Sequence, residues 1–251
     1  MGRSLKEVFS FKRPTGNMKK IIANYFFEFV ILVLGISVSF WLNERSIANI
    51  EKQEAQKVLE NISMEIADLK KYCAERSDTW NQDIALYTAF LDEQLDLDKI
   101  KGQTTSKSRI EYNLIYYRAF EPPMNRYLSI INSGDIKLIK SDKLKEVLSR
   151  LHTYNYSSIE TTVQYEKTIK EQLVQLLTDN HPDLILAVDD SHVSLEDFAS
   201  MLHRAIQQHP ELKTKLLVQM KYFETRKSLL QLYVFALEEL ESELQRAQEE
   251  A

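Results

Sequence analysis

The residue whose chemistry fits its surroundings least in this sequence is a carboxylate inside an apolar run. Glu28 lies within residues 21–42, IIANYFFEFVILVLGISVSFWL, where Asn24 is the only other strongly polar side chain. In hydrocarbon an ionised carboxylate costs about 2.5 kcal/mol or more unless it is protonated, paired or facing water. We therefore expect Glu28 to carry a proton or to bind a hydrogen-bond partner.

Glu28 shares one helical face with other polar and small residues. At about 100° per residue, a sector of about 60° holds four residues of the run: Asn24, Glu28, Gly35 and Ser39. Small residues four apart let helix backbones approach closely, and polar side chains hydrogen-bond across such a contact. The pattern predicts a helix–helix interface, either between copies of this chain or with another membrane protein. The simpler alternative is a lone anchor whose Glu28 reaches towards Lys19 and Lys20.

The run 21–42 is long enough to cross a bilayer. At about 1.5 Å per residue it is about 33 Å long, against a hydrocarbon core of about 30 Å. The run exceeds the apolar part of a signal peptide, and no cleavage pattern of small residues follows it, so we expect an uncleaved signal anchor. A buried core helix is the alternative interpretation.

Charge sets the expected orientation. Residues 1–20 hold six Lys or Arg and one Glu, whereas the whole chain has a net charge of -5. A basic head on an acidic body argues against nucleic-acid binding and suits contact with an anionic lipid surface. By the positive-inside rule residues 1–20 are cytoplasmic, and residues 43–251 are then periplasmic on a bacterial inner membrane. The predicted cytoplasmic anchor consists of Lys12, Arg13, Lys19 and Lys20.

No other residue pattern predicts catalysis, a cofactor or a metal. The five histidines form none of the spacings that bind zinc, and the phosphate-binding and hydrolase motifs are missing from the sequence. Cys73 lies on an apolar helix stripe, so we expect a core residue and not a nucleophile. The tyrosines in the middle of the chain are expected mainly as core fillers, with carbohydrate or partner binding as the alternative. We therefore expect no enzyme.

Five Gly and five Pro in 251 residues favour an all-α fold. Apolar residues at spacings of three and four predict a transmembrane helix that continues into an elongated helical bundle. The predicted elements after residue 42 are a long helix 43–98, short helices within 110–133, a helix 142–180, and helices 195–208 and 211–250. Residues 101–108 and 183–193 are expected as connectors. Tyr154 and Tyr165 are expected on the buried face of helix 142–180.

Two stretches of the sequence resemble a known family. FFEFVILVLGISVSFWLNER and FEPPMNRYLSIINSGDIKLIKSDKLKEVLSRLHTYNYS are similar to the pattern of an uncharacterised family of bacterial single-span membrane proteins, domain-of-unknown-function family six-zero-nine-zero. The resemblance covers nearly the whole chain. It departs from the family at Ser37, Ser39 and Phe40, which stand where the family has a more aliphatic run. The resemblance implies a membrane location and no activity.

Two functions follow as hypotheses. The first is a non-enzymatic single-pass inner-membrane protein with a periplasmic helical domain, which acts as an assembly, scaffold or sensor subunit through contacts in the membrane. The alternative is a stator-like subunit of an ion-driven membrane machine, in which Glu28 carries protons. Both predict the lipid membrane and either a second copy or another membrane protein as partners.

Overall fold

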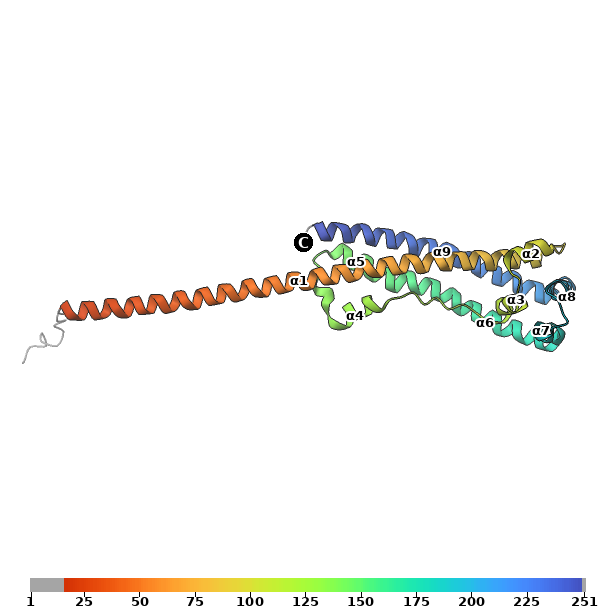
Figure 1. Cartoon of the computed structure of the whole chain (residues 1–251), viewed down its shortest axis with the longest axis horizontal. Helices are drawn as coiled ribbons and strands as arrows, with labels where there is room; N and C mark the ends of the chain where they lie inside the picture. Colours follow the sequence, from red (N-terminus) through yellow and green to blue (C-terminus); the bar gives the residue numbers. More distant parts are fainter. Residues whose placement is uncertain (1–15, 250–251) are drawn as a thin grey trace, which may run out of the picture. The chain divides into compact units, whose positions relative to one another are not determined.

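The structure is a computed structural model that describes residues 16–249. Every regular element in this range is helical, which confirms the all-α prediction. The chain divides into two compact units, Met1–Glu54 and Ala55–Ala251, and each is described by itself. The elements in chain order (Figure 1) are α1 (Gly16–Leu91), α2 (Leu97–Gln103), α3 (Lys107–Ile115), α4 (Asn125–Ser133), the 3₁₀ turn η1 (Asp135–Leu138), α5 (Asp142–Arg150), the π-helical turn η2 (Leu151–Asn155), α6 (Tyr156–Asn180), α7 (Pro182–Asp189), α8 (Leu195–Gln208) and α9 (Pro210–Glu249).

Helix α1 is unbroken over 76 residues. By length and composition it is the one helix of the described chain that is suited to cross a membrane, and none of its most apolar stretch is buried. Helix α1 continues through Arg76, which is a good helix former and whose guanidinium lies 5.0 Å from the ring centroid of Tyr72. The predicted apolar N-terminal helix that continues into further helices is confirmed.

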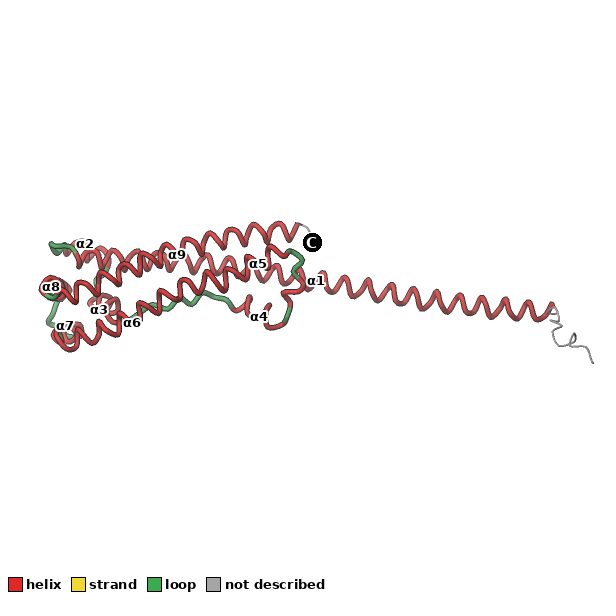
Figure 2. The backbone as a smooth tube through the Cα atoms, turned by 180° about the vertical axis from the view of Figure 1, so that it is seen from behind, coloured by secondary structure: helices red, strands yellow, loops and turns green. Residues whose placement is uncertain are grey.

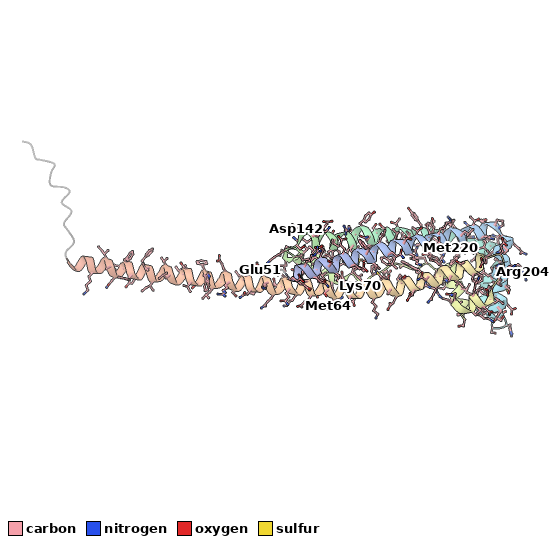
Figure 3. All side chains as sticks on the ribbon, turned by 90° about the horizontal axis from the view of Figure 1, so that it is seen from above. Glu51, Met64, Lys70, Asp142, Arg204 and Met220 are labelled. Atoms are coloured by element: carbon pink, nitrogen blue, oxygen red, sulfur yellow. The ribbon has the colours of Figure 1, made fainter. Side chains whose placement is uncertain are left out.

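The second unit is a bundle of long helices. From Ala55 onwards α1 lies beside α9, while α5, η2 and α6 follow each other along the same bundle (Figures 1 and 2). Helices α7 and α8 lie at one end of the unit, and α4 lies at the other. Lys70 of α1 lies next to α9 (Figure 3), where its Nζ donates to Glu241 Oε2 at 2.6 Å.

The apolar interior of this bundle forms two separate clusters. The first cluster surrounds Trp80 and Phe120 and includes Cys73. The second cluster surrounds Phe90 and Phe198. On α1 the first cluster ends at Trp80 and the second begins at Leu86, so the residues between them form a distinct layer of the interior.

The predicted helix 43–98 is wrong at its C-terminal end. Helix α1 ends at Leu91, and Asp96 caps α2 by accepting hydrogen bonds from the backbone N–H groups of Asp98 and Lys99, each at 3.1 Å. Acidic side chains oppose the dipole at a helix C-terminus and favour a new N-terminus, which explains the break. The expected connector 101–108 is correspondingly shorter, because α2 reaches Gln103 and α3 begins at Lys107.

The first of the short helices expected within 110–133 is α3, which ends at Ile115. Residues 116–124 run as an extended segment between α3 and α4 (Figure 2). Phe120 is fully buried, with its ring centroid 5.5 Å from that of Tyr72 and 5.6 Å from that of Tyr233. The backbone N–H of Glu121 donates to Tyr72 Oη at 2.7 Å. Burial of one aromatic ring and this hydrogen bond hold the segment in place of a longer helix.

The predicted helix 142–180 contains a wide turn that rotates its second half. In η2 the backbone N–H groups donate to the carbonyl five residues earlier, one residue further than in an α-helix. The side chains of α6 are therefore rotated about the helix axis, and each inward-facing position falls about one residue later than in a regular α-helix. Tyr154 and Tyr165, which we expected to be buried, are 70% and 55% exposed. Glu166 faces the interior in place of Tyr165, and Lys170 follows it one turn later; they are 1% and 2% exposed.

The remaining elements are close to the prediction, with two exceptions. The expected connector 183–193 contains α7, and the 3₁₀ turn η1 lies between the helices predicted within 110–133 and over 142–180. Helix 195–208 is confirmed, and Ser194 caps it by accepting a hydrogen bond from the Asp197 N–H at 3.0 Å. The last helix begins at Pro210 and reaches Glu249. Residue 250, with which we expected it to end, lies outside the described residues.

Only some of the central tyrosines are the core fillers that we expected, since Tyr127 and Tyr156 pack against the first apolar cluster. Three are partly buried: Tyr112, Tyr127 and Tyr156. Four are exposed: Tyr116, Tyr117, Tyr154 and Tyr165. Rings pair at the surface instead, as in the stacked pair of Tyr165 and Tyr222, whose centroids are 5.9 Å apart.

Candidate functional site

The predicted membrane face lies on one stretch of α1. Asn24, Glu28 and Gly35 are exposed, and a Cβ added at Gly35 would meet nothing within 4 Å. Ser39 Oγ donates to the backbone oxygen of Gly35 at 2.9 Å. The Ser39 hydroxyl is thus satisfied within its own helix, whereas Asn24 and Glu28 bond to no side chain of residues 16–249.

The basic anchor is described only in part. Lys12 and Arg13 lie outside the described residues, whereas Lys19 and Lys20 belong to the first turns of α1. At the other end of the apolar stretch, the Arg45 guanidinium lies 5.4 Å from the ring centroid of Trp41. Tryptophan is enriched where hydrocarbon meets the headgroups, so this pair would suit the edge of a bilayer.

The bundle holds a second candidate site that sequence reasoning missed. Between the two apolar clusters lies a set of charged side chains that are at most 2% exposed, called here the buried charge layer: Asp83, Glu166, Lys170 and Arg226. They come from three long helices, α1, α6 and α9. Charges in a protein interior need partners, because desolvation costs several kcal/mol per ion.

Arg226 is the best satisfied member of the buried charge layer. Its Nη1 donates to Glu166 Oε2 at 2.7 Å, while its Nε and Nη2 donate to the hydroxyl and the backbone oxygen of Thr162, both at 2.9 Å. The guanidinium also lies 5.4 Å from the Trp80 ring centroid. Burial raises the pKa of Glu166, although the charge of Arg226 opposes that shift. These hydrogen bonds and the ion pair connect Arg226 of α9 to Thr162 and Glu166 of α6.

Asp83 connects α1 to α3 and to the extended segment. Its Oδ1 accepts from Arg109 Nη2 at 2.6 Å, and its Oδ2 accepts from Arg118 Nε at 3.0 Å. Both arginines keep part of their side chains in solvent, with exposed fractions of 25% and 18%. Burial raises the pKa of the Asp83 carboxyl, and the charge of Arg109 opposes the shift. The short contacts support an ionised Asp83.

Lys170 is the least compensated charge of the layer. Its Nζ donates to the backbone oxygen of Asn113 and to Tyr87 Oη, the latter at 3.2 Å, and Tyr87 donates to the same Asn113 oxygen. Among the described residues no carboxylate lies within ion-pair distance of its ammonium. Burial lowers the pKa of Lys170 to about 7, although Glu166 and Asp83 oppose the shift. A neutral amine therefore competes with the ammonium near neutral pH.

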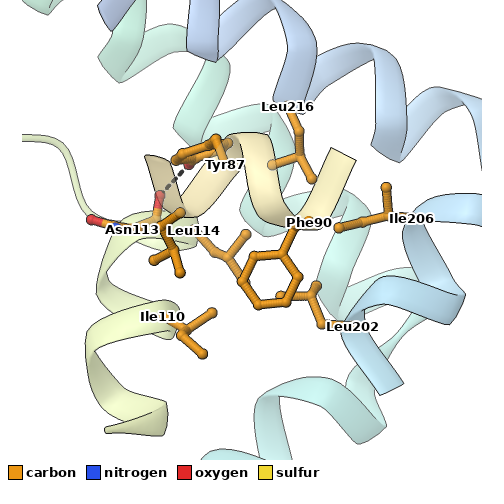
Figure 4. Close-up of a pocket in the computed structure, with 9 residues that line it drawn as sticks. Tyr87, Phe90, Ile110, Asn113, Leu114, Leu202, Ile206 and Leu216 are labelled. Atoms are coloured by element: carbon orange, nitrogen blue, oxygen red, sulfur yellow. Dashed lines mark hydrogen bonds between the residues drawn. The ribbon is translucent and has the colours of Figure 1, made fainter. Parts of the chain in front are cut away.

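Figure 4 shows the space beside Lys170's partners Tyr87 and Asn113. The cavity measures about 10 Å³ and is lined mainly by leucine and isoleucine side chains together with Phe90. A site of this size has room for about one water molecule. Neither the cavity nor the layer, whose members are almost fully buried, gives a substrate a path to the Lys170 amine.

The sequence contained a signal for the buried charge layer. On α9 the apolar stripe skips from Phe223 to Leu230, and Arg226 fills the gap at helical spacing. On α6 Glu166 and Lys170 stand four apart between Val163 and Leu173. A charged residue at an otherwise apolar stripe position marks a candidate buried charge, because the helix periodicity places it inward.

Cys73 is a core residue, as predicted, with an exposed fraction of 1%. Burial raises the pKa of its thiol to about 12. Because only the thiolate reacts, we expect a maleimide or iodoacetamide at pH 8 to label Cys73 in the folded chain roughly a thousandfold more slowly than a free cysteine of pKa about 8.5. Mass spectrometry of labelled protein, with and without urea, measures this ratio. Rapid labelling in the absence of urea would contradict the burial.

Comparisons of the chain with protein-family models, with curated proteins and with solved structures gave no match. The resemblance to domain-of-unknown-function family six-zero-nine-zero therefore stays a prediction.

Proposed function

We propose that this chain is a non-enzymatic single-pass protein of a bacterial inner membrane, with a cytoplasmic N-terminus and a periplasmic helical bundle, that acts as an assembly, scaffold or sensor subunit. The observation that supports this proposal best is the exposed apolar stretch of α1, which no described part of the chain covers. Lipid and a partner helix are the surroundings that such a surface requires.

The polar residues on that stretch favour contact with a partner helix in addition to contact with lipid. Asn24 and Glu28 have no hydrogen-bond partner among the described residues. A protonated carboxyl and an amide both donate and accept, so they can bond across a helix contact. Interhelical polar contacts of this type contribute about 0.6–2 kcal/mol, or roughly a threefold to thirtyfold change in association.

We expect Glu28→Leu to reduce association of the full chain in bilayers by roughly threefold to thirtyfold, because it removes the polar contact and keeps the apolar length. Chemical cross-linking in native membranes, followed by mass spectrometry of the linked species, measures the change. Phe26→Leu is the matched control, since Phe26 lies about 160° from Glu28 on the helix. Equal cross-linking in all three chains would rule out a contact through this face.

Glu28→Gln separates the ion-driven alternative from the proposal. Glutamine keeps the ability to donate and accept hydrogen bonds but cannot release a proton. Under the proposal, Glu28→Gln associates like the native chain. Loss of a proton flux in membranes that hold the native chain, together with unchanged association, would favour the ion-driven machine instead.

A further inference from the structure

The contact face of the membrane helix continues beyond the apolar stretch. Because α1 is unbroken, the helical phase of Glu28 is preserved through residues 43–54. At about 100° per residue, Ser46 lies at about 0° from Glu28, Gln53 at about -20° and Ile50 at about +40°. Residues 20–54 are exposed apart from the partly exposed Val30, so no other element within residues 16–249 covers this part of α1.

Charged residues avoid that face. Between Leu42 and Ala55 every charged side chain lies at least about 80° from the Glu28 direction. They are Glu44, Arg45, Glu51, Lys52 and Glu54. The residues on the face itself are uncharged, which matches the polar but neutral character of Asn24 and Ser39 in the apolar stretch. Apart from the Glu28 carboxyl, one stripe of uncharged residues, called here the neutral stripe, thus extends over about 44 Å, from Asn24 to Gln53.

The two flanks of the stripe carry opposite charges. Arg45 and Lys52 lie at about -100° and -120°, whereas Glu54 and Glu51 lie at about +80° and +140°. In a parallel pair of identical helices related by a twofold axis, the basic flank of one helix lies beside the acidic flank of the other. Flanking charges of this kind set partner choice and orientation in paired helices.

From this pattern we propose that α1 pairs in parallel with α1 of a second copy of this chain, along the neutral stripe from Asn24 to Gln53. The inference rests on the proposed function, because it identifies the partner of the same membrane face. Copies that insert with one orientation meet in parallel, with equal residues at equal depth. The Ser39 hydroxyl, already bonded to Gly35, leaves the stripe small enough for close approach.

Single cysteines in the full chain test this pairing. In a Cys73→Ser background, Ser46→Cys and Gln53→Cys place a thiol on the stripe, and Ala48→Cys and Ala55→Cys place one on the opposite side of the same helix. After copper–phenanthroline oxidation in membranes, we expect disulfide-linked dimers several-fold more abundant from Ser46→Cys and Gln53→Cys. Equal yields at all four positions, or higher yields from the alanine positions, would overturn the pairing.

Ser39→Cys, on the same face within the apolar stretch, separates failure of this inference from failure of the proposed function. If Ser39→Cys forms dimers but positions 46 and 53 show no preference over positions 48 and 55, the contact within the apolar stretch is supported and the contact along residues 43–54 is overturned. An absence of dimers at every position, combined with a Glu28→Leu effect on association, would overturn the second copy as partner and leave another membrane protein. Loss of dimers from Ser39→Cys on adding Ser46→Glu, but not Ala48→Glu, would support the neutral stripe.

Discussion

Replacing Arg226 with methionine is expected to lower the free energy of unfolding of the bundle by about 3–5 kcal/mol. The change leaves Glu166 as a buried carboxylate that has lost its nearest cation, which lies 2.7 Å from it in the native chain. Thr162 loses less, because its hydroxyl still donates to the backbone oxygen of Ile159 at 2.7 Å. The unpaired charge of Glu166 is therefore the main cause of the loss.

A double variant tests whether the lost stability comes from charge or from packing. Arg226→Met with Glu166→Leu removes both charges and keeps apolar volume, and we expect it to recover most of the loss, because buried ion pairs are often replaceable by packed apolar side chains. Urea unfolding of the full chain in detergent, followed by labelling of Cys73, measures both variants. Arg246→Met is the control on the same helix, since Arg246 is 68% exposed and should change stability by at most about 1 kcal/mol. A double variant as unstable as Arg226→Met would mean that packing dominates.

The helical architecture was predictable because its signals are local. Apolar residues at spacings of three and four identified the stripes of α1 and α9, and nearly all of those residues are buried. Ser194 carries a cap that depends only on neighbouring residues. Gly134 ends α4 in the left-handed conformation, with φ of 78°, which glycine adopts without strain. In each case the determining contacts lie within one turn of the chain.

The features that were missed depend on contacts between distant segments. Phe120 lies in the extended segment and packs between Tyr72 and Tyr233, and nothing near Phe120 in the sequence specifies that space. The turn η2 shifts the face of α6 by about one residue, so a regular 3.6-residue period placed Tyr165 in the interior where Glu166 lies. The membrane face was predictable as a periodicity, whereas the internal hydrogen bond of Ser39 needed the structure.

The second large effect is expected from Lys170→Met, as a change in the pH dependence of stability. Burial lowers the pKa of Lys170 to about 7 in the folded chain, against about 10.4 when unfolded. Between these values the unfolded chain binds more protons, so this group makes the bundle more stable as the pH rises, and contributes no slope below about pH 7. From pH 7 to 8.5 the gain is about 2 kcal/mol. Lys170→Met should lose this slope and be more stable than the native chain at pH 7.

The difference in free energy of unfolding between Lys170→Met and the native chain, taken at each pH, isolates the contribution of Lys170 from those of groups whose effect on stability has the opposite sign. Burial raises the pKa of Cys73 to about 12, so above about pH 8.5 the unfolded thiol ionises while the folded thiol does not, and stability falls. This contribution is common to both chains and cancels in the difference. Urea midpoints from tryptophan fluorescence at pH 7, 7.75 and 8.5 measure that difference, which should shrink by about 2 kcal/mol across the series. Lys167→Met, on the exposed face of the same helix, should keep the native slope. A difference between Lys170→Met and the native chain that stays constant with pH would show that the buried amine remains charged throughout, held by Asn113 and Tyr87 alone.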